Sequence, residues 1–233
     1  MTMRVLLNKS SFHTKMIEIT KQTKTNIFKL FRSNPSMKSY EILDSLRKAK
    51  KPIITTNDIA KFGAKNRKYA SLLAKRLVKR GMLKSIEKGK YCLPETPVFA
   101  VASTIIFPAY ISFLSAFYLN ALTDQMPSTV TVITLRPRPS LQIDNVKIQF
   151  VAYSKSRFFG YKKESIDGWP VFVAESEKAI ADCLFSSKYS SATYLKEVLG
   201  DKSISKKKLL SIIKKFYPKF VLKRFKNLTG ARK

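Results

Sequence analysis

The segment from Lys65 to Arg80 combines apolar and cationic residues at the spacing of an amphipathic helix. Tyr69, Leu73 and Leu77 recur every four residues, and residues three or four apart share one helix face. The opposite face of such a helix is mostly cationic. Arginine and asparagine can make paired hydrogen bonds with guanine and adenine, whereas lysine mainly neutralises phosphates. The spacing therefore predicts a helix that contacts the bases and phosphates of nucleic acid.

The predicted contact residues divide by their expected partners. In a helix-turn-helix, the N-terminal part of the second helix enters the major groove. Asn66, Arg67 and Lys68 are then best placed for base edges, and later residues such as Lys75 for phosphates. Lys88, at the tip of a predicted hairpin, is expected to contact the backbone or the minor groove. The full predicted DNA-binding set is Thr56, Lys65, Asn66, Arg67, Lys68, Ser71, Lys75, Lys79, Arg80, Lys84, Lys88 and Lys90.

Three predicted helices and a hairpin would position these residues. Thr56 is the expected N-cap of the second helix, and Gly63 supplies the tight turn that follows it. A glycine-bearing turn between two alternating apolar segments is typical of a hairpin. This order of elements predicts a winged helix-turn-helix over residues 36–94. The elements are helices over 39–46, 57–62 and 65–80, and a hairpin over 83–93 that turns at 87–89.

The charge balance indicates a polyanionic partner. The 233 residues hold 45 Lys+Arg against 15 Asp+Glu, a formal net charge of +30, with a hydrophobic fraction of 45% that is normal for folded proteins. Such an excess indicates nucleic acid or an acidic membrane surface. Basic and acidic residues number 7 and 1 over 1–35, 16 and 4 over 36–94, 8 and 8 over 95–187, and 14 and 2 over 188–233. Because residues 95–187 are neutral overall, we expect the basic segments on either side of them to bind the polyanion.

The chain changes character beyond Pro94, and we expect an α+β protein of four regions. These are a basic N-terminal arm (1–35), the winged helix-turn-helix (36–94), a mixed α/β domain (95–187) and a basic helical C-terminal region (188–233). The α/β domain is expected to contain helices over 98–107 and 110–122 separated by Pro108, strands over 129–135, 146–153, 158–161 and 169–174, and a helix over 175–185. Two or three short helices, ending around Gly200, Pro218 and Gly230, are expected to follow.

Residues suited to catalysis are sparse, so we expect no enzyme activity. The only histidine is His13, in the N-terminal arm, and neither a GxxxxGK[ST] nor a GxGxxG motif occurs. Metal-dependent nucleases usually carry an acid followed by acid-x-Lys on an adjacent strand, and the acids of the middle region lack that spacing. These acids are Asp144, Asp167, Glu175, Glu177 and Asp182. We predict no catalytic residue, no metal and no cofactor.

The two cysteines and the lengths of the apolar segments indicate in which cellular compartment the protein is expected. Cys92 and Cys183 stand far apart among apolar neighbours and are expected to be buried thiols, which fits a reducing compartment. No segment reaches the ~18 apolar residues that a membrane helix needs, and the start lacks a secretion-signal pattern. We expect a cytoplasmic, nucleoid-associated protein with no membrane partner. Frequent Lys and Ile with scarce Gln favour a thermophilic source.

Three short motifs, in this order and spacing, resemble AbiEi-type antitoxins of type IV toxin–antitoxin systems. They are Gly-Lys-Tyr-Cys-Leu-Pro at 89–94, Ala-Tyr-Ile-Ser at 109–112 followed by Ser115, Ala116 and Leu119, and Pro-Val-Phe-Val-Ala-Glu-Ser-Glu-Lys-Ala-Ile-Ala-Asp at 170–182. The resemblance covers about residues 36–187. Phe113 and Asn120 stand where relatives often carry histidine, and residues 1–35 have no counterpart.

The resemblance implies a winged-helix domain that binds operator DNA, usually as inverted repeats, and represses its own operon. It also implies a second domain that neutralises a nucleotidyltransferase-like toxin, and palindromic operators favour a homodimer on DNA. The expected function is therefore a double-stranded DNA-binding transcriptional repressor that acts as an antitoxin. The alternative is an architectural, chromatin-type protein of low sequence specificity, because neutralised phosphates raise affinity for any duplex. The sequence leaves open the operator, the existence of a toxin, the oligomeric state and the role of residues 1–35.

Overall fold

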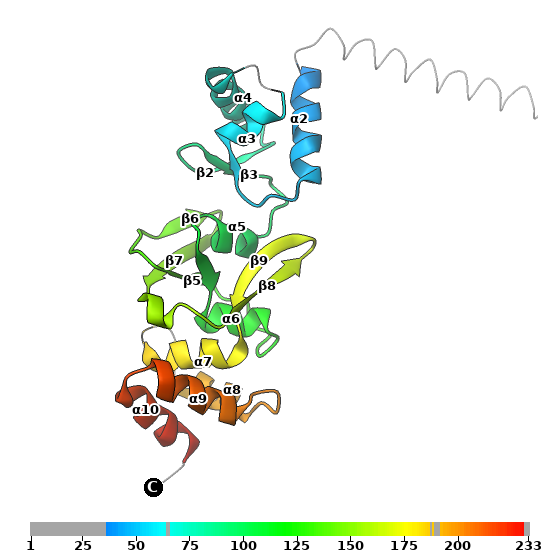
Figure 1. Cartoon of the computed structure of the whole chain (residues 1–233). Coiled ribbons are helices and arrows are strands. Elements are labelled where there is room, and N and C mark those ends of the chain that lie inside the picture. The colour runs from blue at the N-terminus through cyan, green and yellow to red at the C-terminus, as the bar shows by residue number, and fades with distance from the viewer. Residues whose placement is uncertain (1–35, 64–65, 187, 189–191, 231–233) are drawn as a thin grey trace, which may run out of the picture.

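The computed structural model describes residues 36–63, 66–186, 188 and 192–230, and within them helices and strands make an α+β fold. This confirms the expected fold class at the level of its secondary structure. In Figure 1 the elements form three tiers along one axis: a small helical module with its own sheet, a larger sheet, and a group of helices. The expected basic arm, residues 1–35 with His13, lies outside the described residues.

The first module comprises residues 36–63 and 66–93. Its three strands pair antiparallel in the order β1-β3-β2, and β2 and β3 form the expected hairpin. The inward residues of the first helix, Ile42, Leu43 and Leu46, are buried as predicted. The elements are α2 (Ser36–Lys48), β1 (Ile54–Thr55), α3 (Thr56–Lys61), α4 (Arg67–Lys79), β2 (Lys84–Glu87) and β3 (Lys90–Cys92).

Helix α4 follows the predicted apolar stripe but begins later than expected. Asn66 stands outside the helix as its N-cap, and its side-chain oxygen accepts a hydrogen bond from the Tyr69 amide at 2.8 Å. Leu73 and Leu77 are buried in a core shared with α2 and α3, while Tyr69 packs against it half-buried. Burial of each such leucine contributes roughly 1.5–3 kcal/mol, so the stripe fixes which face of α4 remains in solvent. The expected first residue, Lys65, lies outside the described residues.

The N-cap of α3 is Thr55, and the prediction of Thr56 is wrong by one residue. The Thr55 hydroxyl accepts a hydrogen bond from the Asp58 amide at 3.2 Å, and the Asp58 carboxylate accepts one from the Thr55 amide at 2.7 Å. This reciprocal pair needs an acid or amide three residues after the cap. A cap at Thr56 would place the apolar Ile59 there, which explains the shift. Lys51 adds an ion pair with Asp58 at 2.7 Å.

Replacing Asp58 with alanine is expected to lower the free energy of unfolding by about 1–2 kcal/mol at neutral pH, because the hydrogen bond from the Thr55 amide to the carboxylate and the ion pair with Lys51 are both lost. Partial burial alone would raise the pKa of Asp58, but hydrogen bonds from Lys51 and Thr55 outweigh it and hold the pKa below 3.8. The folded protein therefore binds this proton less readily than the unfolded chain does. The stabilisation is present above pH 3.8 and is lost as the pH falls through the lowered pKa.

Urea unfolding of the full chain, at neutral pH and at about pH 3, checks this expectation. The difference between Asp58→Ala and the unmodified protein should narrow in acid. Asp44→Ala is the matched control, because Asp44 forms only an exposed ion pair with Lys48 on α2, and its effect should stay within about 0.5 kcal/mol. A difference for Asp58→Ala that does not change with pH would contradict the capping role.

The second tier is a six-stranded mixed sheet in the order β6-β7-β5-β4-β9-β8. Strand β4 is parallel to β9 and β5 is parallel to β7, while the other neighbours are antiparallel. The elements are α5 (Val98–Thr104), β4 (Ala109–Ile111), α6 (Phe113–Leu119), β5 (Thr129–Thr134), β6 (Leu141–Ile143), β7 (Val146–Ala152), the 3-10 turn η1 (Lys155–Arg157), β8 (Tyr161–Ile166) and β9 (Trp169–Ala174).

Two predictions for this sheet are wrong. The helix expected over residues 110–122 begins as strand β4, which lies between β5 and β9 with all three residues buried, and only α6 is helical. A three-residue apolar strand has no periodicity that separates it from a buried helix. The strand expected over 158–161 is instead β8, whose residues 162–165 are exposed on a sheet edge. Charged residues on edge strands discourage pairing with other chains, and they hide the alternation of a strand.

The third tier contains α7 (Ser176–Phe185), α8 (Ala192–Gly200), α9 (Lys206–Phe216) and α10 (Lys219–Thr229). The helix expected over 175–185 is confirmed, with Glu175 as its N-cap. Two or three later helices were expected, and the described residues form three, which end at Gly200, before Pro218 and before Gly230 as predicted. We call α8, α9 and α10 the C-terminal helices.

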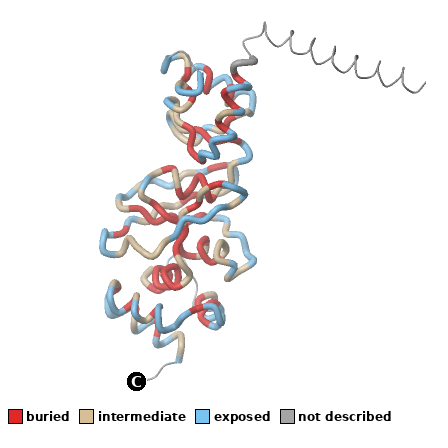
Figure 2. Tube along the Cα trace, turned by 45° about the vertical axis from the view of Figure 1, so that its right-hand side comes forward, coloured by how far each residue is buried: buried red, intermediate tan, exposed pale blue. Residues whose placement is uncertain are grey.

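The apolar residues gather in two cores that extend across the tiers. One core joins the first module to α5 and to one side of the sheet, where Val101, Val130 and Trp169 lie. The other joins the opposite side of the sheet and α6 to α7 and the C-terminal helices. Figure 2 shows these buried segments running through the middle of the molecule. The first module and the C-terminal helices are therefore both packed onto the sheet.

The cysteines are free and buried, as predicted. Burial raises the pKa of the Cys92 thiol to about 11. Across the described part of the chain, no helix combines the length and the apolarity needed to cross a bilayer.

Candidate nucleic-acid interface

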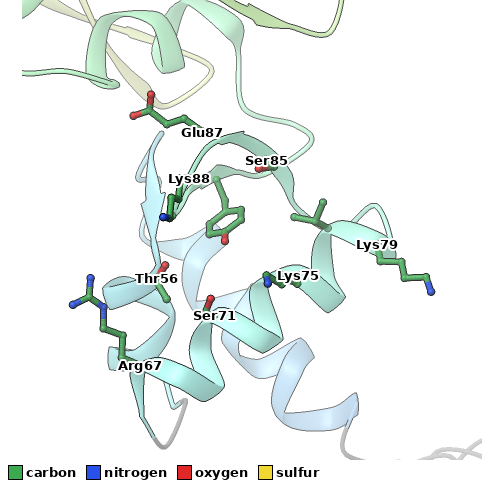
Figure 3. Close-up of a pocket in the computed structure, with 11 residues that line it drawn as sticks. Thr56, Arg67, Ser71, Lys75, Lys79, Ser85, Glu87 and Lys88 are labelled. Carbon is green, nitrogen blue, oxygen red and sulfur yellow. The ribbon is translucent and has the colours of Figure 1, made fainter.

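A pocket of about 770 Å³ opens between α4 and the β2–β3 hairpin (Figure 3). Helix α4 forms one wall, the hairpin forms the other, and the start of α3 lies between them. The lining residues are Thr56, Arg67, Ser71, Lys75, Val78, Lys79, Ser85, Glu87, Lys88, Gly89 and Tyr91.

The wall formed by α4 follows from the burial of its opposite face. Arg67, Ser71, Lys75 and Lys79 recur every four residues, so they share one side of the helix. Arg67, Lys75 and Lys79 are exposed, and Ser71 is half-buried. In Figure 3 Ser71 and Lys75 face the space below the hairpin, whereas the end of Lys79 points away from it. The helix thus presents a row of donors toward the pocket.

The hairpin wall is tied to the start of α3. The Thr56 amide donates a hydrogen bond to the Gly89 carbonyl at 3.3 Å. Gly89 adopts a φ of +76°, which glycine tolerates best, and a Cβ there would lie 3.6 Å from the Thr56 hydroxyl. This close approach sets Lys88, which is exposed, opposite the donor row of α4 (Figure 3).

The pocket is cationic. Arg67, Lys75, Lys79 and Lys88 line it together with one carboxylate, Glu87. Partial burial alone would raise the pKa of Glu87, but a hydrogen bond from Lys90 and the nearby positive charges outweigh it, so the pKa is held below 4.5. Glu87 therefore stays ionised at neutral pH.

The charge of Glu87 is balanced by residues that do not line the pocket. Lys90 lies 2.8 Å from its carboxylate, and Arg138 of the loop between β5 and β6 forms an ion pair with the other oxygen. The four lining cations are thus left to attract an anion. A groove with this excess of donors is suited to phosphate or base oxygens.

The same contacts attach the hairpin to the sheet. Lys84 forms an ion pair with Asp144 at 2.5 Å, and Lys90 also donates to the Ile105 carbonyl at 2.8 Å. Arg138 lies over the Phe150 ring at 4.9 Å while it holds Glu87. The second tier therefore sets the orientation of the hairpin relative to α4.

The structure brings some predicted contact residues together and leaves others apart. Thr56, Arg67, Ser71, Lys75, Lys79 and Lys88 line the pocket. Lys68 and Arg80 are exposed on α4 and at its C-cap, outside the lining, and Asn66 caps the helix. Lys84 and Lys90 bind the second tier through the contacts above. Lys65 lies outside the described residues.

Sequence reasoning missed Val78, Ser85, Glu87, Gly89 and Tyr91 as lining residues. Ser85 and Tyr91 are register partners across the hairpin, so their side chains share one face. The alternation of side chains along β3, which places Tyr91 on the opposite face from Lys90 and Cys92, was visible in the sequence. The predicted contact set favoured lysine and arginine because of their charge, so it left out these uncharged and acidic lining residues.

A separate polar cluster is buried beneath the sheet. Lys178 and Asp182 of α7 are both fully buried and form an ion pair at 2.5 Å. Asp182 also accepts hydrogen bonds from the Ser112 hydroxyl at 2.6 Å and the Tyr217 hydroxyl at 2.5 Å. Lys178 donates to the Tyr217 hydroxyl at 2.8 Å. We call these four residues the buried cluster.

The acids considered for a metal site lie in separate places. Asp144 binds Lys84, whereas Glu175 and Glu177 both bind Lys208. Asp182 belongs to the buried cluster. Across residues 36–63, 66–186, 188 and 192–230, no group of three or more His, Cys, Asp or Glu side chains is arranged to hold a metal ion.

The fold is similar to that of a protein whose structure has been solved. No protein-family model matches the chain, and no curated protein matches it. Among solved structures, the chain is similar to the RV2827C protein from Mycobacterium tuberculosis, with a TM-score of 0.55 and 11% sequence identity. The match covers 82% of this chain and 76% of that protein. At this identity the similarity is one of fold alone.

Proposed function

We propose that the first module is a winged helix-turn-helix that binds double-stranded DNA, with α4 as the recognition helix and the β2–β3 hairpin as the wing. The observation that carries the proposal is that Arg67, Ser71 and Lys75, which recur every four residues on α4, line the same pocket as Lys88 on the hairpin. A helix fits the major groove of B-DNA, and an adjoining wing can follow the backbone.

The pocket residues suit different parts of a duplex. Arg67 is the first residue of α4, so it is closest to the groove floor and can pair bidentately with guanine. Lys75 and Lys88 offer single ammonium groups, which suit phosphates. Asn66 uses its side-chain oxygen as the helix cap, so within the proposal Arg67 contributes more to base reading than Asn66 does.

Within this proposal, the protein is a transcriptional repressor. The resemblance to AbiEi-type antitoxins supports repression of its own operon, a homodimer on inverted repeats, and neutralisation of a nucleotidyltransferase-like toxin. The net charge of +30 supports a second candidate, an architectural DNA-binding protein of low specificity. The two candidates differ in the ratio of specific to non-specific affinity.

Selection from a pool of random duplexes, followed by competition at several salt concentrations, tests the proposal. A repressor should enrich one motif, and the motif duplex should outcompete random duplex by at least about a thousandfold near physiological salt. Binding that falls steeply with salt and enriches no motif would favour the architectural candidate. No binding to duplex DNA at low salt would overturn both.

Replacing Arg138 with methionine is expected to weaken binding to the selected duplex about fivefold. Arg138 does not line the pocket, but it pairs with Glu87, which does. Without Arg138 the negative charge of Glu87 is less well balanced and repels the phosphates of DNA, and the hairpin loses a contact with the sheet. Fluorescence anisotropy with the labelled duplex measures the effect. Arg136→Met is the matched control, because Arg136 is exposed in the same loop and carries the same charge. Equal losses in both variants would show that only net charge matters.

A further inference from the structure

The C-terminal helices carry a cationic surface that the proposed winged helix does not use. Helices α9 and α10, residues 206–229, hold nine basic residues and no acidic residue. These basic residues are Lys206, Lys207, Lys208, Lys214, Lys215, Lys219, Lys223, Arg224 and Lys226, and all of them are exposed. We call this set the cationic face.

The cationic face is held in place by packing. The inner sides of α9 and α10 bury Leu209, Ile213, Val221 and Phe225 in the second core. Because each helix is amphipathic, burial of one side fixes the lysines on the other side toward solvent. Tyr217, at the corner between the two helices, is itself part of the buried cluster and donates a hydrogen bond to Asp182 of α7. The charges therefore belong to a fixed surface of the fold.

Within the part of the chain that the structure describes, most side chains of the cationic face have no ion-pair partner. Lys208 is held by Glu175 at 2.8 Å and Glu177 at 3.0 Å, and Arg224 donates to the Leu184 carbonyl at 2.9 Å. Within the described residues, the other lysines of the face make no ion pair with a carboxylate. Their charges remain available to an external anion.

Helix stability does not explain where these charges lie. The first turns of α9 and α10 hold no acid, yet α9 begins with Lys206 and Lys207, and α10 begins with Lys219. The positive end of a helix dipole disfavours cations by roughly 0.3–1 kcal/mol each. Their placement thus opposes local stability, which a bound polyanion would offset.

The residue types indicate a sequence-independent partner. Eight of the nine cations are lysines, whose point charges neutralise phosphates without the paired geometry that arginine offers to bases. The face lies at the end of the molecule opposite α4, with the sheet between them (Figure 1). The intervening residues 95–187 hold 8 basic and 8 acidic residues, so they do not extend the cationic surface.

We propose that the cationic face of α9 and α10 is a second DNA-binding surface, which contacts the phosphate backbone of duplex DNA without regard to sequence. The choice of DNA over another polyanion rests on the proposed function of the first module. The two surfaces are separate, so each can bind without the other.

Charge-removing variants on a random-sequence duplex test this surface. The variant Lys214→Gln, Lys219→Gln, Lys223→Gln should bind at least fivefold more weakly at moderate salt. Its plot of log affinity against log salt should become shallower by about 2–3, since each lost phosphate contact removes about 0.9 from the slope. Each change is at an exposed position, so thermal unfolding should be nearly unchanged.

The matched control removes the same charge from residues 95–187. Lys147→Gln, Lys155→Gln, Lys163→Gln changes three exposed lysines of residues 95–187 and should leave the salt slope within about 1 of the unmodified value. Equal slopes for the two triple variants would overturn the second surface, because long-range charge alone would then explain binding. Preferential binding of a polyanion such as heparin over duplex, lost in the C-terminal variant alone, would overturn the choice of DNA.

A pocket variant separates this inference from the proposed function. Arg67→Ala, Lys75→Ala, Lys88→Ala should abolish selection of a motif but retain the salt-dependent binding that the cationic face provides. If the pocket variant loses all binding and the C-terminal variant loses none, the second surface is wrong and the winged helix stands. If only the C-terminal variant loses binding, the proposed function of the first module is wrong and the second surface stands.

Discussion

Replacing Arg67 with alanine is expected to lower affinity for the selected duplex about 10- to 100-fold and affinity for random duplex by about threefold or less. A bidentate contact between arginine and guanine discriminates against other bases by roughly 1–3 kcal/mol. Arg67 is exposed at the first position of α4 and lines the pocket, so nothing in the described fold depends on its side chain. Truncation should therefore remove specificity and leave the module folded.

Two other pocket variants make this test sharper. Lys75→Ala and Lys88→Ala should weaken selected and random duplexes by similar factors, because a phosphate contact carries no sequence information. Arg76→Ala is the matched control for charge, since Arg76 is exposed on α4 but does not line the pocket. Anisotropy titrations of both duplexes at one salt concentration give the ratio of the affinity for the selected duplex to the affinity for random duplex. An Arg67→Ala variant that loses both affinities equally would refute its role in base reading.

The sequence predicted α4 and the C-terminal helices well, because the signals for them are local in the chain. The stripe through Leu73 and Leu77 located α4, and the helix-ending residues Gly200, Pro218 and Gly230 located the ends of the C-terminal helices. Local periodicity could not predict strand β4. Its three residues become a strand only because β5 and β9 flank them, and β5 follows while β9 lies some sixty residues later in the chain.

The candidate site was predictable where it depends on one helix and not where it depends on tertiary contacts. The four-residue spacing of Arg67, Ser71 and Lys75 is visible in the sequence. Lys84 and Lys90 looked equally available on the hairpin, yet Asp144 and the Ile105 carbonyl hold them. Neither partner can be inferred from local spacing. Which cations of the hairpin can bind a ligand therefore depends on contacts with the six-stranded sheet and α5, and these contacts are seen only in the three-dimensional structure.

Breaking the buried cluster is expected to have the largest effect on stability. Asp182→Asn should lower the free energy of unfolding by about 3–5 kcal/mol, because it leaves the ammonium of Lys178 buried without a counter-charge. The side chain of Lys178 has little room to move. Its aliphatic part packs so closely on the backbone of Gly160 that a Cβ added to this glycine would lie only 3.2 Å from it. Four aromatic rings surround its nitrogen at 5.2–5.5 Å from their centroids. The loss should also loosen α9, which Tyr217 ties to the cluster.

Chemical denaturation with matched variants measures this effect. The exposed pair Asp44–Lys48 has the same four-residue spacing, with side chains 61% and 77% exposed, so Asp44→Asn should cost about 0.5 kcal/mol or less. Lys178→Met combined with Asp182→Asn should recover part of the loss, since replacing a buried pair by neutral groups is often tolerated. Equal losses for the two asparagine variants would contradict a role for burial.

The pH dependence of Asp182→Asn distinguishes an uncompensated charge from a packing defect. Burial lowers the pKa of Lys178, and the charge of Asp182 opposes that shift. Without Asp182 the pKa should fall further, so the folded state releases this proton at a lower pH than the unfolded chain does. Stability rises with pH wherever the unfolded state binds more protons, and the deficit of the variant should therefore shrink as the pH rises from the lowered pKa of Lys178 toward 10.5. A packing defect would leave the deficit constant over this range, because no proton would be involved.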